Sequence, residues 1–328
     1  MHTVDTHFHW YPRDSFEALA ESPTFPRTER VGDGYRFLFN GGNNVIPLPA
    51  VWFDLDAGFA ASEAATGSET AVVSTTGVLS GLLDQMPLGE AVGYAHEMNE
   101  ALAKVQRERA GRFFGTASVP LQDTAEALAV LEHAIGRLDL RGVNLPPLTG
   151  TEPIDVARLE PFYARVEELG VPLIVHPTDL AFAEVLGGYG DALQRTIGRP
   201  FDSSITILRL VFSGIMHRYP ALKVLHTHAG GLLPQQAGRI DKNARIAELP
   251  EPPSTYLKRT YVDTVAPHAA GSIRTALEFY GAEHVLYGTD YPCWSPTAAG
   301  QVIGELGLDE AGQALLFAEN AHRIFDLS

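Results

Sequence analysis

Two kinds of residue are scarce in this sequence, cysteine and the basic residues, and each shortage excludes classes of protein. The 328 residues include a single cysteine, Cys293, so no disulfide forms within the chain and no zinc cluster is built from thiolates. Lysine and arginine number 24 against 40 acidic residues, a formal net charge of −16. Such a chain repels phosphate backbones and anionic lipid, and no basic run offsets the charge locally, so a nucleic-acid partner is not expected.

Long apolar runs are missing as well. No segment reaches the roughly 18 uninterrupted apolar residues of a membrane span, so no membrane partner is expected. The opening residues, MHTVDTHFHW, lack the basic start and the apolar stretch of a signal peptide. The cytoplasm is therefore the expected location. An apolar content of 45% and a charged content of 20% are typical of a globular protein with a large core.

Short apolar segments rich in β-branched residues alternate with segments of helical periodicity. There are eight apolar segments: Thr3–His9, Thr70–Thr76, Phe113–Pro120, Arg141–Pro147, Pro172–Thr178, Lys223–Ala229, Thr260–Val265 and Val285–Pro292. The helical segments include Leu88–Ala110, Thr124–Gly136, Val156–Leu169, Ser203–Arg218 and Ala269–Tyr280. Parallel β-α-β units of this kind predict an α/β fold, a (β/α)₈ TIM barrel. An open doubly wound sheet is the alternative, and it is disfavoured because no G-x-G-x-x-G follows the first strand.

Some helix ends are also predicted. Asp123, Asp155 and Asp202 stand where an N-cap is expected, since an aspartate side chain accepts hydrogen bonds from the free N–H groups of the first turn. Gly170 and Gly281 stand where helices are expected to stop, because glycine adopts the left-handed conformation of a C-cap without strain.

One insertion, from Trp10 to about Thr66, interrupts the alternation. Within it, Tyr35–Phe39 and Asn44–Leu48 flank Gly41-Gly42, a pattern that predicts a β-hairpin. An excursion after the first strand of a barrel lies over the end where active sites are built, so residues 10–66 are expected to form a lid or a substrate wall. A decorative or oligomer-forming arm is the alternative. Neither a repeat nor a linker is apparent, so residues 1–328 are predicted to form a single domain.

Several histidines stand at the C-terminal ends of predicted strands, which form the catalytic face of a TIM barrel. They are His7, His9, His176, His226 and His228. Residues i and i+2 of a strand point to the same side, so His7 and His9 both aim into the barrel mouth. His176 on the fifth strand and Asp290 on the eighth are placed to complete a ligand set. Three imidazoles and a carboxylate suit Zn²⁺, and Mn²⁺ would also tolerate them, so a bound divalent ion is predicted.

A second His-x-His pair precedes two glycines. His228 lies nearer the rim than His226, and Gly230 and Gly231 let the backbone approach a ligand closely. His228 is predicted to be catalytic, as an acid or as an electrophile that polarises a substrate oxygen. A fifth metal ligand or a buried hydrogen-bonding residue is the alternative. His226 is predicted to be structural.

Acidic residues at strand ends have separate predicted roles. Asp290 is expected both to bind the ion and to shuttle a proton. Asp5 is expected to brace the first strand, with a hydrogen bond to a ligand histidine as the alternative. Asp263 is expected to contact either the substrate or a ligand residue.

Six short motifs, in this order, resemble those of the amidohydrolase superfamily, and within it the branch typified by aminocarboxymuconate-semialdehyde decarboxylase. They are Asp5–His9, Leu173–Thr178, Pro200–Ser204, Tyr219–Lys223, Thr227–Pro234 and Gly288–Pro292. The resemblance extends from Val4 to about Phe325. Around His176 and His228 the pattern is closer to enzymes of the 6-methylsalicylate decarboxylase type. By resemblance, the metal ligands are His7, His9, His176 and Asp290, and the catalytic histidine is His228.

The resemblance implies a metal-dependent, non-oxidative decarboxylase of a small, hydroxylated aromatic or unsaturated carboxylic acid, without an organic cofactor and as a homodimer. A metal-dependent hydrolase of a lactone, an amide or a C–C bonded ketone is the alternative, because the same ion could activate water. A barrel that binds metal or ligand without catalysis is disfavoured, since binding alone requires no acid/base at the same mouth.

Two features depart from the patterns of this branch. Aminocarboxymuconate-semialdehyde decarboxylase has a substrate-binding arginine after its first-strand insertion, and no arginine stands at the corresponding place near Asn44–Val51. A subgroup of the aromatic-acid decarboxylases has Glu-x-His on the first strand, whereas this chain has His-x-His. Arg13, Arg36 and Arg199 are the candidates for binding the substrate carboxylate.

Overall fold

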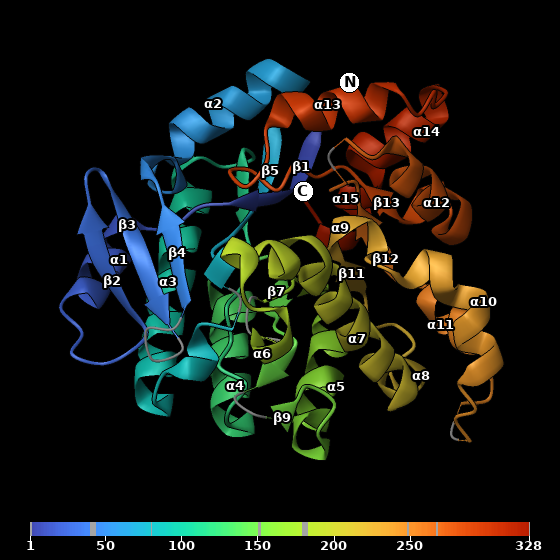
Figure 1. Cartoon of the computed structure of the whole chain (residues 1–328), viewed down its shortest axis with the longest axis horizontal. Coiled ribbons are helices and arrows are strands. Elements are labelled where there is room, and N and C mark those ends of the chain that lie inside the picture. Colours follow the sequence, from blue (N-terminus) through green and yellow to red (C-terminus); the bar gives the residue numbers. More distant parts are fainter. Residues whose placement is uncertain are drawn as a thin grey trace.

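The computed structural model describes residues 2–327 except 40–43, 80, 150–151, 179–182, 248 and 267. Eight parallel strands lie at its centre, each within a segment that the sequence predicts (Figure 1). They are β1 (Val4–His9), β5 (Thr70–Ser74), β6 (Phe113–Gly115), β7 (Val143–Leu145), β10 (Leu173–Val175), β11 (Val224–His226), β12 (Tyr261–Asp263) and β13 (Val285–Leu286).

These strands form a closed TIM barrel. Two parallel runs, β1-β5-β6 and β13-β12-β11-β10-β7, make up most of the cylinder. Short seams join the runs: Ala117 N donates to Gly142 O at 2.7 Å after β6, and His9 N donates to Tyr291 O at 2.8 Å between β1 and the segment after β13. The predicted α/β class and (β/α)₈ architecture are therefore confirmed.

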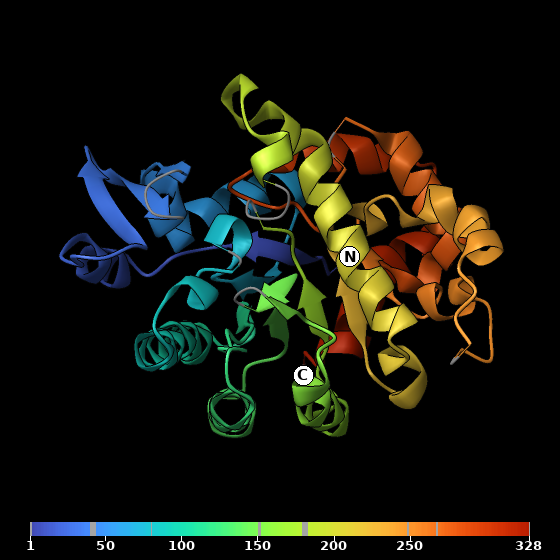
Figure 2. The ribbon, with the colours of Figure 1, turned by 60° about the horizontal axis from the view of Figure 1, so that its bottom comes forward.

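Helices pack around the outside of the barrel (Figures 1 and 2). Those that correspond to predicted segments are α3 (Leu88–Glu108), α4 (Thr124–Leu131), α5 (Glu160–Leu169), α7 (Arg199–Phe212) with α8 (Ile215–Arg218), and α12 (Ala270–Tyr280). The others outside the insertion are α6 (Ala183–Leu186), α9 (Thr227–Gly230), α10 (Leu233–Asn243), α11 (Pro253–Leu257), α13 (Pro296–Gly304), α14 (Glu310–Ala314) and α15 (Asn320–Phe325). Within the described ranges, none of the helices combines the length and the apolarity that crossing a bilayer requires.

Three of the predicted helix ends are confirmed. The carboxylate of Asp123 accepts hydrogen bonds from two backbone N–H groups in the first turn of α4. Gly170 ends α5 with a φ of 70°, and Gly281 follows α12 with a φ of 87°. Both glycines adopt backbone conformations that a β-carbon would strain.

Two predicted N-caps are wrong. The Asp155 carboxylate accepts a hydrogen bond from Arg209 Nε at 2.7 Å, on a neighbouring helix. Asp202 lies inside α7, which begins at Arg199, and its Oδ2 accepts from Thr178 N at 2.8 Å. In both cases a partner that is distant in the sequence takes the carboxylate, and local pattern alone does not reveal such a partner.

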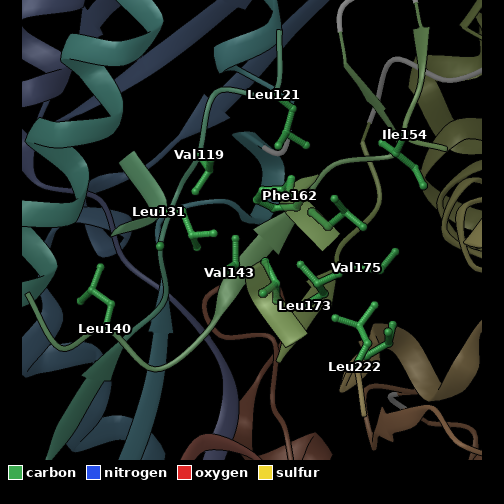
Figure 3. Packing of buried hydrophobic residues seen from close by; sticks show 14 of the residues in the cluster. Val119, Leu121, Leu131, Leu140, Val143, Ile154, Phe162, Leu173, Val175 and Leu222 are labelled. Carbon is green, nitrogen blue, oxygen red and sulfur yellow. The ribbon is translucent and has the colours of Figure 1, made fainter. Parts of the chain in front are cut away.

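The barrel packs against its helices through alternate strand residues. Val143 and Leu173 are paired in register, and Val175 lies one pleat further along. Figure 3 shows these side chains facing Phe162 of α5, and all four are buried. Each such side chain contributes roughly 1.5–3 kcal/mol through burial. This packing fixes the strand register on which the positions at the barrel mouth depend.

The intervening residues point into the barrel and fill its lower part. Ile174 belongs to a buried cluster with Val72, Leu225 and Leu286 from other strands, and Phe325 of α15 packs against it. The N-terminal end is thus closed by apolar side chains.

The insertion after β1 is an antiparallel sheet with flanking helices; the sheet and α1 are at the left of Figure 1, and α2 is at the top. Its elements are α1 (Arg13–Ala20), β2 (Arg27–Val31), β3 (Gly34–Phe39), β4 (Asn44–Leu48) and α2 (Leu55–Thr66). The predicted pairing of β3 with β4 is confirmed, whereas Gly41-Gly42 lie outside the described residues. The sequence analysis missed β2, whose RTERV sequence is too charged to stand out as a strand.

Candidate metal centre

All the predicted site residues meet at the C-terminal end of the barrel. His7 and His9 come from β1, His176 follows β10, His228 follows β11, and Asp290 follows β13. His7, His9, His176 and Asp290 are each at most 5% exposed. The side chain of His228 is 17% exposed, so it lies nearest the rim, as predicted.

The side chains approach one another through the atoms that bind metals. His7 Nε2 lies 3.0 Å from His9 Nε2, and Asp290 Oδ1 lies 3.0 Å from His9 Nε2 and 3.4 Å from His7 Nε2. Asp290 Oδ2 lies 3.4 Å from His228 Nε2. The ring of His176 is 5.1–5.2 Å from the rings of His7, His9 and His228, centre to centre. Donor atoms of His7, His176, His228 and Asp290 all lie within 4.8 Å of one another.

This donor set fits a divalent cation. Asp290 Oδ1 is buried and makes no hydrogen bond of acceptable geometry within the described structure, despite its closeness to two imidazoles. A buried carboxylate oxygen without a donor is costly unless a positive charge stands beside it. Imidazole nitrogens and one carboxylate oxygen are the ligands that Zn²⁺ and related ions prefer. The barrel mouth is therefore a metal-binding site by its chemistry.

Hydrogen bonds turn two of the histidines toward the centre of this site. His7 Nδ1 donates to Asp263 Oδ2 at 2.7 Å, and His176 Nδ1 donates to the carbonyl of Pro177 at 3.0 Å. With Nδ1 protonated, Nε2 carries the lone pair that a metal takes. The contact of Asp263 with His7 supports the second of the two roles expected for Asp263.

Asp263 also holds the loop that carries His228. Its Oδ1 accepts from Ala229 N at 3.2 Å and from Val265 N at 3.0 Å. One buried carboxylate thus couples the ring orientation of His7 to the backbone next to His228.

The backbone at His228 and Asp290 is strained. Their φ angles are 60° and 56°, and Ala229 has a φ of 53°. Left-handed conformations of non-glycine residues cost about 1–3 kcal/mol each and persist where the surroundings require them, often at functional sites. At Gly231, with a φ of 58°, a β-carbon would lie 2.5 Å from Ser204 Oγ. Gly231 was predicted to let the backbone approach a ligand closely. In the structure the group that leaves no room for a β-carbon at Gly231 is the Ser204 hydroxyl.

Asp5 and His226 are buried polar residues in β1 and β11, two of the strands that lead to the site. Asp5 accepts from Thr289 Oγ1 at 2.6 Å, Thr289 N at 3.1 Å and His7 N at 3.2 Å, so it ties β1 to the segment that carries Asp290. Burial raises the pKa of Asp5 to about 6, although these hydrogen bonds act in the opposite direction. His226 is fully buried, and its Nε2 lies 3.0 Å from Ser203 Oγ. The bracing role of Asp5 and the structural role of His226 are confirmed.

The charges at the site favour a positive charge on His7, which lies beside the carboxylates of Asp290 and Asp263. Burial lowers the pKa of His7, but the charge of Asp290 and the hydrogen bond to Asp263 outweigh it and raise that pKa to about 9. Burial keeps the pKa of His9 below its usual value, and that of His176 well below. Burial would raise the pKa of Asp290, yet the charge of His7 and the neighbouring imidazoles of His228 and His9 hold it well below its usual range. His9 and His176 are therefore neutral and Asp290 is ionised, as metal binding requires, whereas His7 has to release a proton before its Nε2 can bind an ion.

The insertion contributes an aromatic wall that the sequence analysis did not identify. Trp52 stacks against His9, with ring centres 6.3 Å apart and planes 21° apart, and also against Tyr11 at 5.0 Å. No local motif marks Trp52, because its contact with His9 depends on how the insertion folds back over the barrel.

The structure does not support Arg13 or Arg36 as the partner of a substrate carboxylate at the metal centre. Arg13 donates to the carbonyl of Asp33, Arg36 pairs with Glu29, and Arg199 begins α7. None of the three is among the described residues that line the space around His7, His9 and His176.

The chain belongs to the amidohydrolase family, whose profile matches residues 4–327. It is 29% identical over 209 residues to the 2-amino-3-carboxymuconate-6-semialdehyde decarboxylase of Dictyostelium discoideum, which covers 62% of this chain and 57% of that protein. It is 26% identical over 300 residues to the 6-methylsalicylic acid decarboxylase of Penicillium expansum, or 89% of this chain and 85% of the relative. The branch that the motifs indicate is confirmed.

The fold is also similar to that of solved structures. One is a dihydroxybenzoic acid decarboxylase from Polaromonas sp. JS666 with bound manganese and the inhibitor 2-nitroresorcinol. It matches with a TM-score of 0.81 and 21% identity, over 99% of this chain and 97% of that chain.

Proposed function

We propose that this chain is a metal-dependent, non-oxidative decarboxylase, a carboxy-lyase that acts on a small, hydroxylated aromatic or unsaturated carboxylic acid. One observation carries the proposal: buried imidazoles and a buried carboxylate gather beside a more exposed histidine at the open end of the barrel. The decarboxylases among the relatives support the same chemistry. We assign the ion to His7, His9, His176 and Asp290, and catalysis to His228 and Asp290.

The reaction replaces a carboxylate by a proton and releases CO₂. A bound divalent ion would supply Lewis acidity and would orient a substrate carboxylate and a neighbouring oxygen. We assign proton transfer to Asp290: its ionised carboxylate would take up a proton from water or from a substrate hydroxyl and pass it to the carbon that loses CO₂. His228, opposite Asp290 Oδ2 at 3.4 Å, is placed to hold or polarise a substrate oxygen. No electrons are transferred, so the proposal requires no organic cofactor.

The proposed ion is Zn²⁺, because imidazole ligands dominate the site, with Mn²⁺ as the second candidate. The structure of the related dihydroxybenzoic acid decarboxylase with bound manganese supports Mn²⁺ as the second candidate. Elemental analysis of protein purified without added metal identifies the bound ion, and adding Zn²⁺ or Mn²⁺ separately to the stripped protein shows which of the two restores activity.

The assignment of His228 as catalytic has an alternative, because the four residues whose donor atoms lie within 4.8 Å of one another include His228 and do not include His9. We expect His228→Ala to retain one ion per chain with little turnover, and His9→Ala to bind metal more weakly. Loss of the ion in the first variant with full retention in the second would reverse the two assignments.

We further propose that residues 10–66 form a wall of the active site within a single catalytic domain. The stacking of Trp52 on His9 supports this role. Trp52→Ala is expected to raise KM more than it lowers kcat, because the residue shapes the pocket without touching the proposed proton path.

A homodimer is the proposed assembly. Exposed apolar side chains recur at every fourth position through Val185, Tyr189, Leu193, Ile197 and Phe201, and Tyr189 is 84% exposed. Figure 2 shows this segment standing out from the barrel, yellow-green at the top of the view. It continues into a mainly apolar groove of about 430 Å³ between α7 and α10. A second copy could cover both surfaces in an isologous contact. Sedimentation should give a dimer, and Tyr189→Lys should shift it toward monomer.

Release of CO₂ is the test of the proposed reaction. Holoenzyme is incubated with a panel of hydroxylated benzoic acids while CO₂ and the phenolic product are measured together. Turnover of lactones or amides in place of acids would support a hydrolase. A cytoplasmic location also remains a prediction, to be tested by cell fractionation.

A further inference from the structure

A second small cavity adjoins the metal centre. It measures about 40 Å³ and lies at the ends of β5, β6 and β7, beneath α3. Its polar lining groups are Thr75, Thr76, Asp84, Tyr94, Ser118 and Asn144, and leucine, methionine and valine side chains complete the wall. None of the functions argued above uses it.

The cavity shares a wall with the metal centre. Thr76 lines both the cavity and the space around His9 and His176. A hydrogen-bonded chain continues this wall, because Ser74 Oγ lies 2.5 Å from Thr76 Oγ1 and donates to Asn144 Oδ1 at 3.2 Å. A molecule bound at the metal is therefore next to this cavity.

The charge of the lining decides which groups can enter. Asp84 is the one carboxyl group among the described lining residues, and no lysine, arginine or histidine is among them. A second carboxylate placed here would lose its hydration and would meet an acidic side chain in place of a cation. A neutral group avoids both costs.

The hydroxyl of Tyr94 decides which neutral group fits best. Its oxygen is buried and has no hydrogen-bond partner within the described structure. Burial raises the pKa of Tyr94, so the phenol is a donor at neutral pH. A buried donor without an acceptor costs about 1–3 kcal/mol, which a ligand oxygen would recover. The lining hydroxyls offer acceptors in return, so a hydroxyl substituent would be matched in both directions.

The size of the cavity limits what it holds. At about 40 Å³ it is well below the roughly 150 Å³ of a cavity that takes benzene. The space accommodates a substituent of a few atoms, and the ring itself has to lie nearer the metal.

We propose that this cavity is a substituent subsite in which Tyr94 donates a hydrogen bond to a neutral oxygen substituent of the substrate. The substrate is accordingly a monocarboxylate whose hydroxyl group enters the subsite, and a dicarboxylate is disfavoured. Tyr94 acts as a specificity-determining residue without taking part in bond breaking. The inference rests on the proposed function for the identity of the acid, and on the cavity for its substituent.

The experiment compares three kinds of acid on the holoenzyme. They are 2-hydroxybenzoate, the dihydroxybenzoates that carry a second hydroxyl at each of the other ring positions, and the dicarboxylate 2-hydroxyisophthalate. Binding is measured by calorimetry and turnover by CO₂ release. We expect at least one dihydroxybenzoate to exceed 2-hydroxybenzoate and the dicarboxylate to be the weakest. Tyr94→Phe should reduce the hydroxyl preference about fivefold, the effect of one neutral hydrogen bond, and leave 2-hydroxybenzoate unchanged. Tyr219→Phe is the matched control, because its hydroxyl bonds Glu160 on the outer surface.

The outcomes separate the subsite from the reaction. Equal losses for all acids in Tyr94→Phe, or preference for the dicarboxylate, would overturn the subsite even if CO₂ is released. A hydroxyl preference in binding that Tyr94→Phe removes, without CO₂ from any acid, would support the subsite and reject decarboxylation.

Discussion

Replacing Asp263 by asparagine should weaken metal binding without removing any group that touches the ion. The carboxylate accepts the Nδ1–H of His7 at 2.7 Å, and both side chains are almost fully buried, at 4% and 0% exposure. A hydrogen bond to a charged acceptor at this distance is about twice as strong as a neutral one. Asparagine keeps the size but loses the charge, so His7 becomes a poorer electron donor and its ring is less firmly oriented. Changes of this kind lower metal affinity about 10- to 100-fold, or about 1.4–2.7 kcal/mol.

The assay is competition for the ion between the protein and a chelator of known affinity, followed by elemental analysis. Asp5→Asn is the matched control, since Asp5 is equally buried but accepts from the backbone N–H groups of His7 and Thr289 and from the Thr289 hydroxyl in place of the imidazole. We expect that variant to unfold at a lower temperature with a much smaller change in metal affinity. Unchanged affinity in Asp263→Asn, or an equal loss in both variants, would refute the argument that Asp263 acts through the His7 ring.

Three other predictions follow from the same geometry. His228→Ala should lower kcat about 10²- to 10⁴-fold while one ion per chain remains bound, and turnover near the normal rate would remove His228 from the mechanism. Gly231→Ala should lower the free energy of unfolding by about 1–3 kcal/mol, because a φ of 58° is strained for alanine and the new β-carbon would lie 2.5 Å from Ser204 Oγ. Chemical denaturation measures the change in stability. An unaltered denaturation midpoint would count against the close approach of Gly231 to Ser204. Burial lowers the pKa of His226 to about 3, so below the unfolded value of about 6.5 the unfolded chain binds a proton that the folded chain does not. Stability from this residue should therefore fall as the pH drops from about 6.5 toward 3, by about 2 kcal/mol at pH 5, and His226→Gln should unfold with a shallower acid dependence than the unaltered chain.

The sequence predicted the barrel and the cluster of site residues because both are set by local, periodic patterns. Each of the eight strands was visible as a short β-branched segment, and His7 and His9 had to share a face because they are two residues apart. What joined them to His176 and Asp290 was the rule that parallel strands of a barrel end at one face. The order of the elements was therefore enough to bring together residues more than two hundred positions apart.

Contacts made by single residues across the fold were not predictable in this way. Asp202 looked like a helix cap, yet its carboxylate bonds Thr178 in a different loop. Trp52 and Tyr94 carry no motif, and their positions depend on how the insertion and α3 pack over the barrel. The three candidate arginines were chosen for charge alone, and the structure engages Arg13 and Arg36 in contacts within the insertion.

The central claim is that one divalent ion is held by His7, His9, His176 and Asp290 and is required for decarboxylation. The most direct test is a crystal structure of protein purified without added metal, with anomalous diffraction measured at the zinc and manganese edges and CO₂ release assayed on the same preparation before and after stripping. The account predicts a single anomalous peak bonded to these four side chains, and turnover that disappears with the ion and returns when it is restored. Full turnover from metal-free protein, or an ion bound elsewhere, would contradict it.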